Sequence, residues 1–222
     1  MKHLTAALAS ACLATSLWSV APVRAAEDEG GFDAALHKLE IDWETAKFTI
    51  PEGSKQTARM DEVGKEADDL AARYPSMVEA RIWKGILDSE RASMAGPISA
   101  LSLAKKARGV LETANQQDAT ALDAGAPTSL GVLYYRVPGF PLAFGDKDKA
   151  RKLLEQATRS APEGLDAWYF YGDFLNGQGE KDAAIAAFRH ALAIPQHADR
   201  PLWDKNRRLV IKQTLAKLNA AS

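Results

Sequence analysis

Residues Leu165–Pro195, LDAWYFYGDFLNGQGEKDAAIAAFRHALAIP, decide the fold of this chain. Aromatic, small and aliphatic residues recur there at intervals of three or four, the spacing of residues on one helix face. Gly177 to Gly179 interrupt the pattern and indicate a turn between two helices. Gly172 and Ala184 are expected to let the helices approach closely, and Trp168 and Phe188 to fill the space between them. The patterned positions are Trp168, Tyr171, Gly172, Leu175, Ala184, Phe188 and Ala191.

The pattern recurs upstream of this segment. Ala150, Leu154 and Ala157 stand 34 residues before Ala184, Phe188 and Ala191, and Pro162 precedes the last hairpin. Leu130-Gly131 resembles the matching first helix, about seven residues too far upstream. Two more hairpins are predicted nearer the N-terminus, one around Gly85 and Ala104 and one from Phe32 to Tyr74. We find no alternating pattern typical of a strand.

These positions resemble the tetratricopeptide pattern, W-x2-L-G-x2-Y followed by A, F, A and P over 34 residues. The resemblance covers most of residues 26–222. It implies an all-α, right-handed superhelix of about four helical hairpins with a C-terminal capping helix, here from about Asp199 to Leu218. Apolar residues on two sides of that last helix predict a second packing surface. It would meet either another copy of the chain, through residues 200–222, or the returning N-terminal helix.

The first 25 residues are typical of a secretory signal peptide. Lys2 precedes an apolar run from Leu4 to Ala21, and Val23-Arg24-Ala25 places small residues before a cleavage site after Ala25. Two alternatives are an uncleaved membrane anchor and a lipoprotein whose lipid is attached to Cys12, because residues 8–12 loosely resemble a lipobox. We favour cleavage and export to the periplasm.

The composition of the chain argues against two classes of function, nucleic-acid binding and cysteine chemistry. Removing residues 1–25 leaves 26 basic against 29 acidic residues, a net charge of about −3, which gives no basic footprint for nucleic acid. Cys12 is the only cysteine, so cleavage leaves a chain without disulfide or thiolate chemistry.

The tetratricopeptide resemblance implies a concave groove lined by the first helix of each hairpin, where a protein or peptide partner binds. By position, the groove residues are Thr128, Val132, Tyr135 and Arg136, then Asp166, Tyr169, Asp173 and Asn176. One family variant clamps a carboxyl terminus with Lys and Asn at set groove positions, and here those positions hold Thr128, Val132, Tyr169 and Asp173, so that clamp is absent.

An insertion at Val137–Gly145 separates the two helices of the third hairpin, and Asp146 is expected to cap the second of them. Phe140, Leu142 and Phe144 are costly to expose together. We therefore expect the insertion to pack onto neighbouring helices as a plug. The alternative is a lip over the groove that contacts a ligand.

No catalytic, cofactor or metal site is predicted. His190, His197 and Asp199 lack the i, i+3 or i, i+4 histidine pair that would place two metal ligands on one helix face. Glu90 resembles the single glutamate of some helical glycosidases, and its ordinary interpretation is a solvated side chain.

Two functions remain open at this point. The first is a non-catalytic periplasmic scaffold or assembly factor that binds a protein or peptide in a polar groove. The second is an accessory component of solute transport, because residues 141–157 and the turn that follows are similar to the helical T-component of tripartite periplasmic transporters. That protein would bind a small hydrophobic ligand in an apolar pocket beside Pro138–Gly145.

Overall fold

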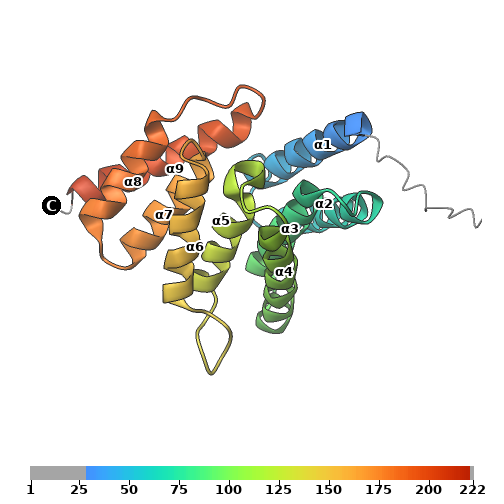
Figure 1. Ribbon diagram of the computed structural model, residues 1–222, viewed down its shortest axis with the longest axis horizontal. Coiled ribbons are helices and arrows are strands. Elements are labelled where there is room, and N and C mark those ends of the chain that lie inside the picture. Colours follow the sequence, from blue (N-terminus) through green and yellow to red (C-terminus); the bar gives the residue numbers. More distant parts are fainter. Residues whose placement is uncertain (1–28, 221–222) are drawn as a thin grey trace, which may run out of the picture.

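The computed structural model describes residues 29–220, and the regular elements in that range are nine α-helices with no strand (Figure 1). The helices lie where apolar residues recur at helical intervals in the sequence, and each helix buries the stripe that these residues form. The helices are α1 (Glu29–Phe48), α2 (Ser54–Arg73), α3 (Val78–Met94), α4 (Pro97–Gln117), α5 (Ala121–Arg136), α6 (Lys147–Ser160), α7 (Leu165–Gly177), α8 (Lys181–Ala193) and α9 (Pro201–Ala220).

Consecutive helices pair as α1 with α2, α3 with α4, α5 with α6, and α7 with α8. These are the four predicted hairpins, and α9 follows as the predicted final helix. Neighbouring hairpins stack, so that α2 contacts α3, α4 contacts α5 and α6 contacts α7. The all-α repeat architecture is therefore confirmed for the described residues.

Close approach within three of the hairpins depends on a glycine in the first helix. A Cβ atom placed on Gly85 would lie 2.4 Å from Leu111 Cγ, and one on Gly131 would lie 2.6 Å from Leu154 Cγ. A Cβ atom on Gly172 would lie 2.8 Å from the ring of Phe188, which is fully buried. The repeated glycine thus sets the distance between paired helices, as the sequence predicts for Gly172.

Trp168 does not fill the space between α7 and α8 as expected. Its indole is half-buried, lies 4.0 Å from the imidazole of His190 between ring centroids, and donates a hydrogen bond from Nε1 to the carbonyl of Pro162 at 2.9 Å. The carbonyl of Pro162 also lies 2.9 Å from Nε2 of His190. Trp168 therefore secures the turn between α6 and α7, while Phe188 fills the hairpin.

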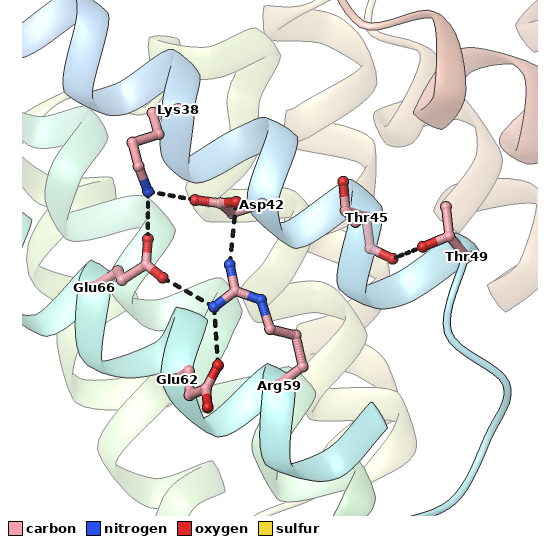
Figure 2. A network of polar contacts seen from close by, with 7 residues as sticks. All are labelled: Lys38, Asp42, Thr45, Thr49, Arg59, Glu62 and Glu66. Atoms are coloured by element: carbon pink, nitrogen blue, oxygen red, sulfur yellow. Dashed lines mark hydrogen bonds and ion pairs between the residues drawn. The ribbon is translucent and has the colours of Figure 1, made fainter. Parts of the chain in front are cut away.

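A network of ion pairs joins the outer surfaces of α1 and α2 (Figure 2). Lys38 contacts Asp42 at 2.5 Å and Glu66 at 3.0 Å, and Arg59 contacts the same two carboxylates at 3.1 and 3.2 Å. Hydrogen bonds to Asp42 and Glu66 raise the pKa of Lys38. Lys38 is exposed and the other three side chains are half-buried at the surface, where water screens ion pairs, so the network fixes the register of the two helices more than it stabilises the fold.

The final helix returns to the N-terminal helix, which is one of the two predicted contacts. α9 packs on α8 and α7 and also contacts α1, from which it is far removed in sequence (Figure 1). Trp203, Arg208 and Ile211 form its buried face, whereas Leu209 is 49% exposed. A contact between copies of the chain through residues 200–222 stays a prediction.

The predicted signal peptide and the candidate lipidation site at Cys12 lie outside the described residues. Among the helices that are described, none combines the length and the apolar character needed to cross a membrane.

The close approach at Gly172 makes a direct stability prediction. Gly172→Ala forces a methyl group against the buried ring of Phe188 and should lower the free energy of unfolding by about 1–3 kcal/mol. Gly109→Ala is the matched control, because Gly109 lies in the interior of α4 with no atom near its added Cβ. That substitution should raise the free energy of unfolding by about 0.5–1 kcal/mol. Urea denaturation measures both, and equal stability of the two variants would contradict the packing account.

Candidate partner-binding pocket

A pocket of about 910 Å³ lies between the first helices of the four hairpins and the returning α9. All four first helices contribute to its wall, as the predicted groove requires, and the insertion between α5 and α6 also borders it. Most of the wall is apolar. Representative lining residues are Leu36, Trp43, Trp83, Ile86, Leu101, Thr128, Val132, Leu133, Phe170 and Trp203.

Arg200 and three tryptophans close one side of the pocket. The guanidinium carbon of Arg200 lies 5.7, 5.3 and 4.8 Å from the ring centroids of Trp43, Trp83 and Trp203. These distances permit cation–π attraction to each ring. α1, α3 and α9 each supply one of the rings, so the cluster joins three helices around a single cation.

Glu44 anchors α9 to α1 beneath this cluster. Its side chain is 1% exposed, and its carboxylate accepts hydrogen bonds from Arg200 Nε at 2.7 Å and from the backbone N–H of Trp203 at 3.1 Å. The second of these bonds satisfies an N–H group in the first turn of α9, where no intrahelical acceptor is available. A buried carboxylate with two such donors is a strong constraint on the position of α9.

Arg207 covers the aromatic residues of α7 from the side of α9. Its guanidinium carbon lies 4.1 Å from the ring centroid of Tyr169 and 4.8 Å from that of Phe170. Asp166 fixes this position, since its Oδ1 accepts a hydrogen bond from Arg207 Nε at 2.6 Å. Tyr169, predicted to line the groove, is consequently buried under Arg207.

Three other predicted groove residues meet between the third and fourth hairpins. The hydroxyl of Tyr135 donates to Asp173 at 2.5 Å, and Arg136 Nη2 donates to the same carboxylate oxygen at 3.1 Å. Burial raises the pKa of Tyr135; the charge of Arg136 works against this rise, and that of Asp173 adds to it. Of the three, only Arg136 lines the pocket.

Two carboxylates of α1 and α3 complete the polar part of the wall. Glu90 pairs with Lys47 at 2.6 Å, so it is not the simply solvated side chain expected from the sequence. Glu40 accepts a hydrogen bond from Trp83 Nε1 at 3.1 Å. Burial raises the pKa of Glu40, and the charge of Arg200 and the hydrogen bond from Trp83 offset this rise only in part.

The start of α5 adds a strained segment to the rim. Leu122, Asp123 and Ala124 have φ angles of 51°, 52° and 59°, the left-handed region that costs a non-glycine residue about 1–2 kcal/mol. Burial of Ala124 against Ala157, Ala161 and Ala167 keeps the segment in place. Leu122 and Asp123 line the pocket as a result.

The insertion at 137–145 lies at the mouth of the pocket. Phe144 packs edge-to-face on Tyr134 at 5.6 Å between ring centroids, as the predicted plug requires. Phe140 and Leu142 contradict that prediction, because they are 93% and 76% exposed. The Gly145 N–H donates to the Pro138 carbonyl at 2.9 Å and closes the base of the loop, so its tip projects away from α5 and α6 (Figure 1).

The lip interpretation therefore describes this loop better than the plug. Leu142 borders the pocket together with Val137, Pro138 and Ala143, whereas Phe140 stands at the exposed tip. Asp146 caps α6 as expected, since its side chain accepts a hydrogen bond from the Lys149 N–H at 2.9 Å.

Half of the predicted groove residues line the pocket, namely Thr128, Val132, Arg136 and Asp166. Tyr135, Tyr169, Asp173 and Asn176 are not among the lining residues. Sequence reasoning named no groove residues on α1 or α3, and it did not include α4 or α9 in the wall at all. The available signal was the predicted second packing side of the final helix, where Trp203 and Arg207 are spaced by four residues.

Comparison with known proteins agrees with this geometry. Residues 142–200 match the family model described as tetratricopeptide repeat. Residues 142–200 are therefore tetratricopeptide repeat sequence. Its fold is similar to that of TTC0263, a thermophilic tetratricopeptide protein of Thermus thermophilus, with a TM-score of 0.55 and 18% sequence identity over 85% of this chain and 92% of that one.

Yeast Tom70 also matches this chain, with a TM-score of 0.32 and 14% identity over 82% of this chain and 47% of Tom70. No protein of curated function matches the sequence.

The anchor at Glu44 can be tested by removing its carboxylate. Glu44→Ala removes the acceptor of Arg200 Nε and of the Trp203 N–H, leaving Arg200 only its longer ion pair with Glu40 at 3.7 Å, and should lower the free energy of unfolding by about 3 kcal/mol. Hydrogen exchange should accelerate most in α9, because its contact with α1 is lost. Glu52→Ala, in the exposed turn before α2, is the control and should change neither quantity. Unchanged protection of α9 in Glu44→Ala would show that the anchor is unimportant.

Proposed function

We propose that this protein is an exported, non-catalytic scaffold that binds a segment of a polypeptide partner in the pocket between α1, α3, α5, α7 and α9. Tetratricopeptide arrays present an extended concave surface, and here that surface is hollowed to about 910 Å³. The single observation that carries the proposal is this hollow with three tryptophans in its wall, since aromatic anchors dominate binding energy at protein interfaces.

Polar groups in the wall favour a polypeptide guest. The Trp43 Nε1–H and the Thr128 hydroxyl are buried and have no hydrogen-bond partner in the described chain. An unpaired buried polar group costs about 1–3 kcal/mol, and a backbone carbonyl or amide of a guest would relieve that cost. Leu142, which is exposed and borders the pocket, supplies further apolar contact area.

A second candidate is a small hydrophobic ligand, as in the transport interpretation. The volume of the pocket falls within the range of small-molecule sites, and the pocket borders the insertion as that interpretation requires. The ion pairs around its wall fit a polypeptide better, because an apolar molecule would desolvate them without compensation.

The binding proposal is tested with a displayed library of random 12-residue peptides, selected on the purified protein. We expect binders that Val132→Trp abolishes, because the indole fills space at the centre of the α5 wall. Asn176→Trp is the control, since Asn176 is exposed and lies outside the pocket lining. Phe140→Ala combined with Leu142→Ala should weaken the same binders without lowering the free energy of unfolding.

Either of two results would overturn the proposal. Peptides that bind all of these variants equally would place the binding surface elsewhere. A library without any binder, together with a bound small molecule in native mass spectra of the purified protein, would favour the ligand interpretation.

Export is tested separately. Expression of the full chain in a Gram-negative host should yield a periplasmic protein whose N-terminal residue is Ala26, as read by intact mass. Ala25→Arg should block processing, because signal peptidase requires a small residue before the cut. A mass that includes residues 1–25, or a lipid adduct on Cys12, would contradict the proposed form.

A further inference from the structure

Every cation of the pocket wall is already neutralised by a carboxylate of the described chain. Lys47 pairs with Glu90 at 2.6 Å, and Arg136 pairs with Asp173 at 3.1 Å. Arg200 pairs with Glu44 at 2.7 Å, and Arg207 pairs with Asp166 at 2.6 Å. An acidic guest would therefore meet only cations that a carboxylate of the chain already neutralises.

Carboxylates, in contrast, are in excess around the pocket. Five carboxylate side chains line the pocket, compared with four cationic ones. Two more carboxylates, Glu44 and Asp173, are ion-pair partners of Arg200 and Arg136. Asp123 and Asp199 are exposed at the wall and have no ion pair in the part of the chain that the structure describes. Both lie at the pocket without a counter-charge, so the local potential favours a cation.

A second, independent feature indicates a guest with a backbone. Thr128 is 3% exposed, lines the pocket, and has a hydroxyl with no hydrogen-bond partner among the described residues. Trp43, 5% exposed, likewise lines the pocket with an unpartnered Nε1–H. A peptide carbonyl can accept from either group, and a peptide N–H can donate to the Thr128 oxygen.

We propose that the guest is a polypeptide segment that carries both apolar and basic side chains, held by the apolar wall and by Asp123 and Asp199. This inference rests on the proposed function and adds the chemistry of the partner. The apolar side chains would contact the ring of Phe170 and the aliphatic residues Ile86 and Leu101. The basic side chains would reach the two unpaired carboxylates, and acidic segments would be rejected by the net negative wall.

The test uses one pocket-dependent peptide from the random library, synthesised with capped ends in three versions. Each Lys and Arg is retained, replaced by Gln, or replaced by Glu, and affinity is followed by tryptophan fluorescence at low ionic strength. We expect the basic version to bind about tenfold more tightly than the Gln version, and the Glu version to bind more weakly still. The preference should shrink as salt is added, since these charges are exposed.

Charge variants of the protein assign the effect to the two aspartates. Asp123→Asn combined with Asp199→Asn should weaken the basic version several-fold and leave the Gln version unchanged. Asn also tolerates the left-handed backbone at position 123, so folding is preserved. Glu52→Gln combined with Asp69→Asn is the control, because both are exposed outside the pocket lining and have no ion pair among the described residues.

The outcomes separate this inference from the proposed function. If the Gln or Glu version of a pocket-dependent peptide bound as tightly as the basic version, the charge preference would be overturned. The proposed binding function would not be affected by that result. The charge preference would also be overturned if the variant with Asn at positions 123 and 199 lost affinity equally for the basic and Gln versions of the peptide. A selection that yields no pocket-dependent peptide removes the proposed function and, with it, this inference.

Discussion

The distance between paired helices is the constraint on which the rest of this structure depends. Gly85, Gly131 and Gly172 each face a large buried side chain of the partner helix, at a separation that leaves no room for a Cβ atom. Tight hairpins can stack with their first helices on one side, and that side is the one that becomes concave. The concave side therefore depends on how closely the two helices of each hairpin pack, and the glycines that set this distance do not themselves line the pocket.

The second level of organisation is the closure of the array by α9. A helical hairpin array ordinarily needs a terminal element to cover its last apolar face. Here that element also contacts α1 and brings Arg200 among the three tryptophans of α1, α3 and α9. Closure places Arg207 of α9, and Arg200 just before that helix, on the pocket wall, so the cap contributes to the proposed binding surface as well as to stability.

The sequence predicts local features well and long-range features poorly. Helical periodicity and the spacing around Gly172 were sufficient for four hairpins and a final helix, because those signals act over a few residues. Half of the groove residues that were predicted by position within the repeat line the pocket. Tyr169 was misplaced because Arg207, on another helix, covers it. The insertion was misjudged because the sequence shows that Phe140 is apolar but not that its loop projects from the helices.

The central claim is that a polypeptide partner occupies the concave pocket. The most direct measurement is photo-crosslinking in the native host, with benzoylphenylalanine placed at Ser129 in the pocket wall or at Thr113 on the exposed face of α4. The account predicts a discrete polypeptide adduct from Ser129, lost when Val132→Trp fills the pocket, and none from Thr113. Equal adducts from both positions, or a Ser129 adduct that persists in Val132→Trp, would contradict it.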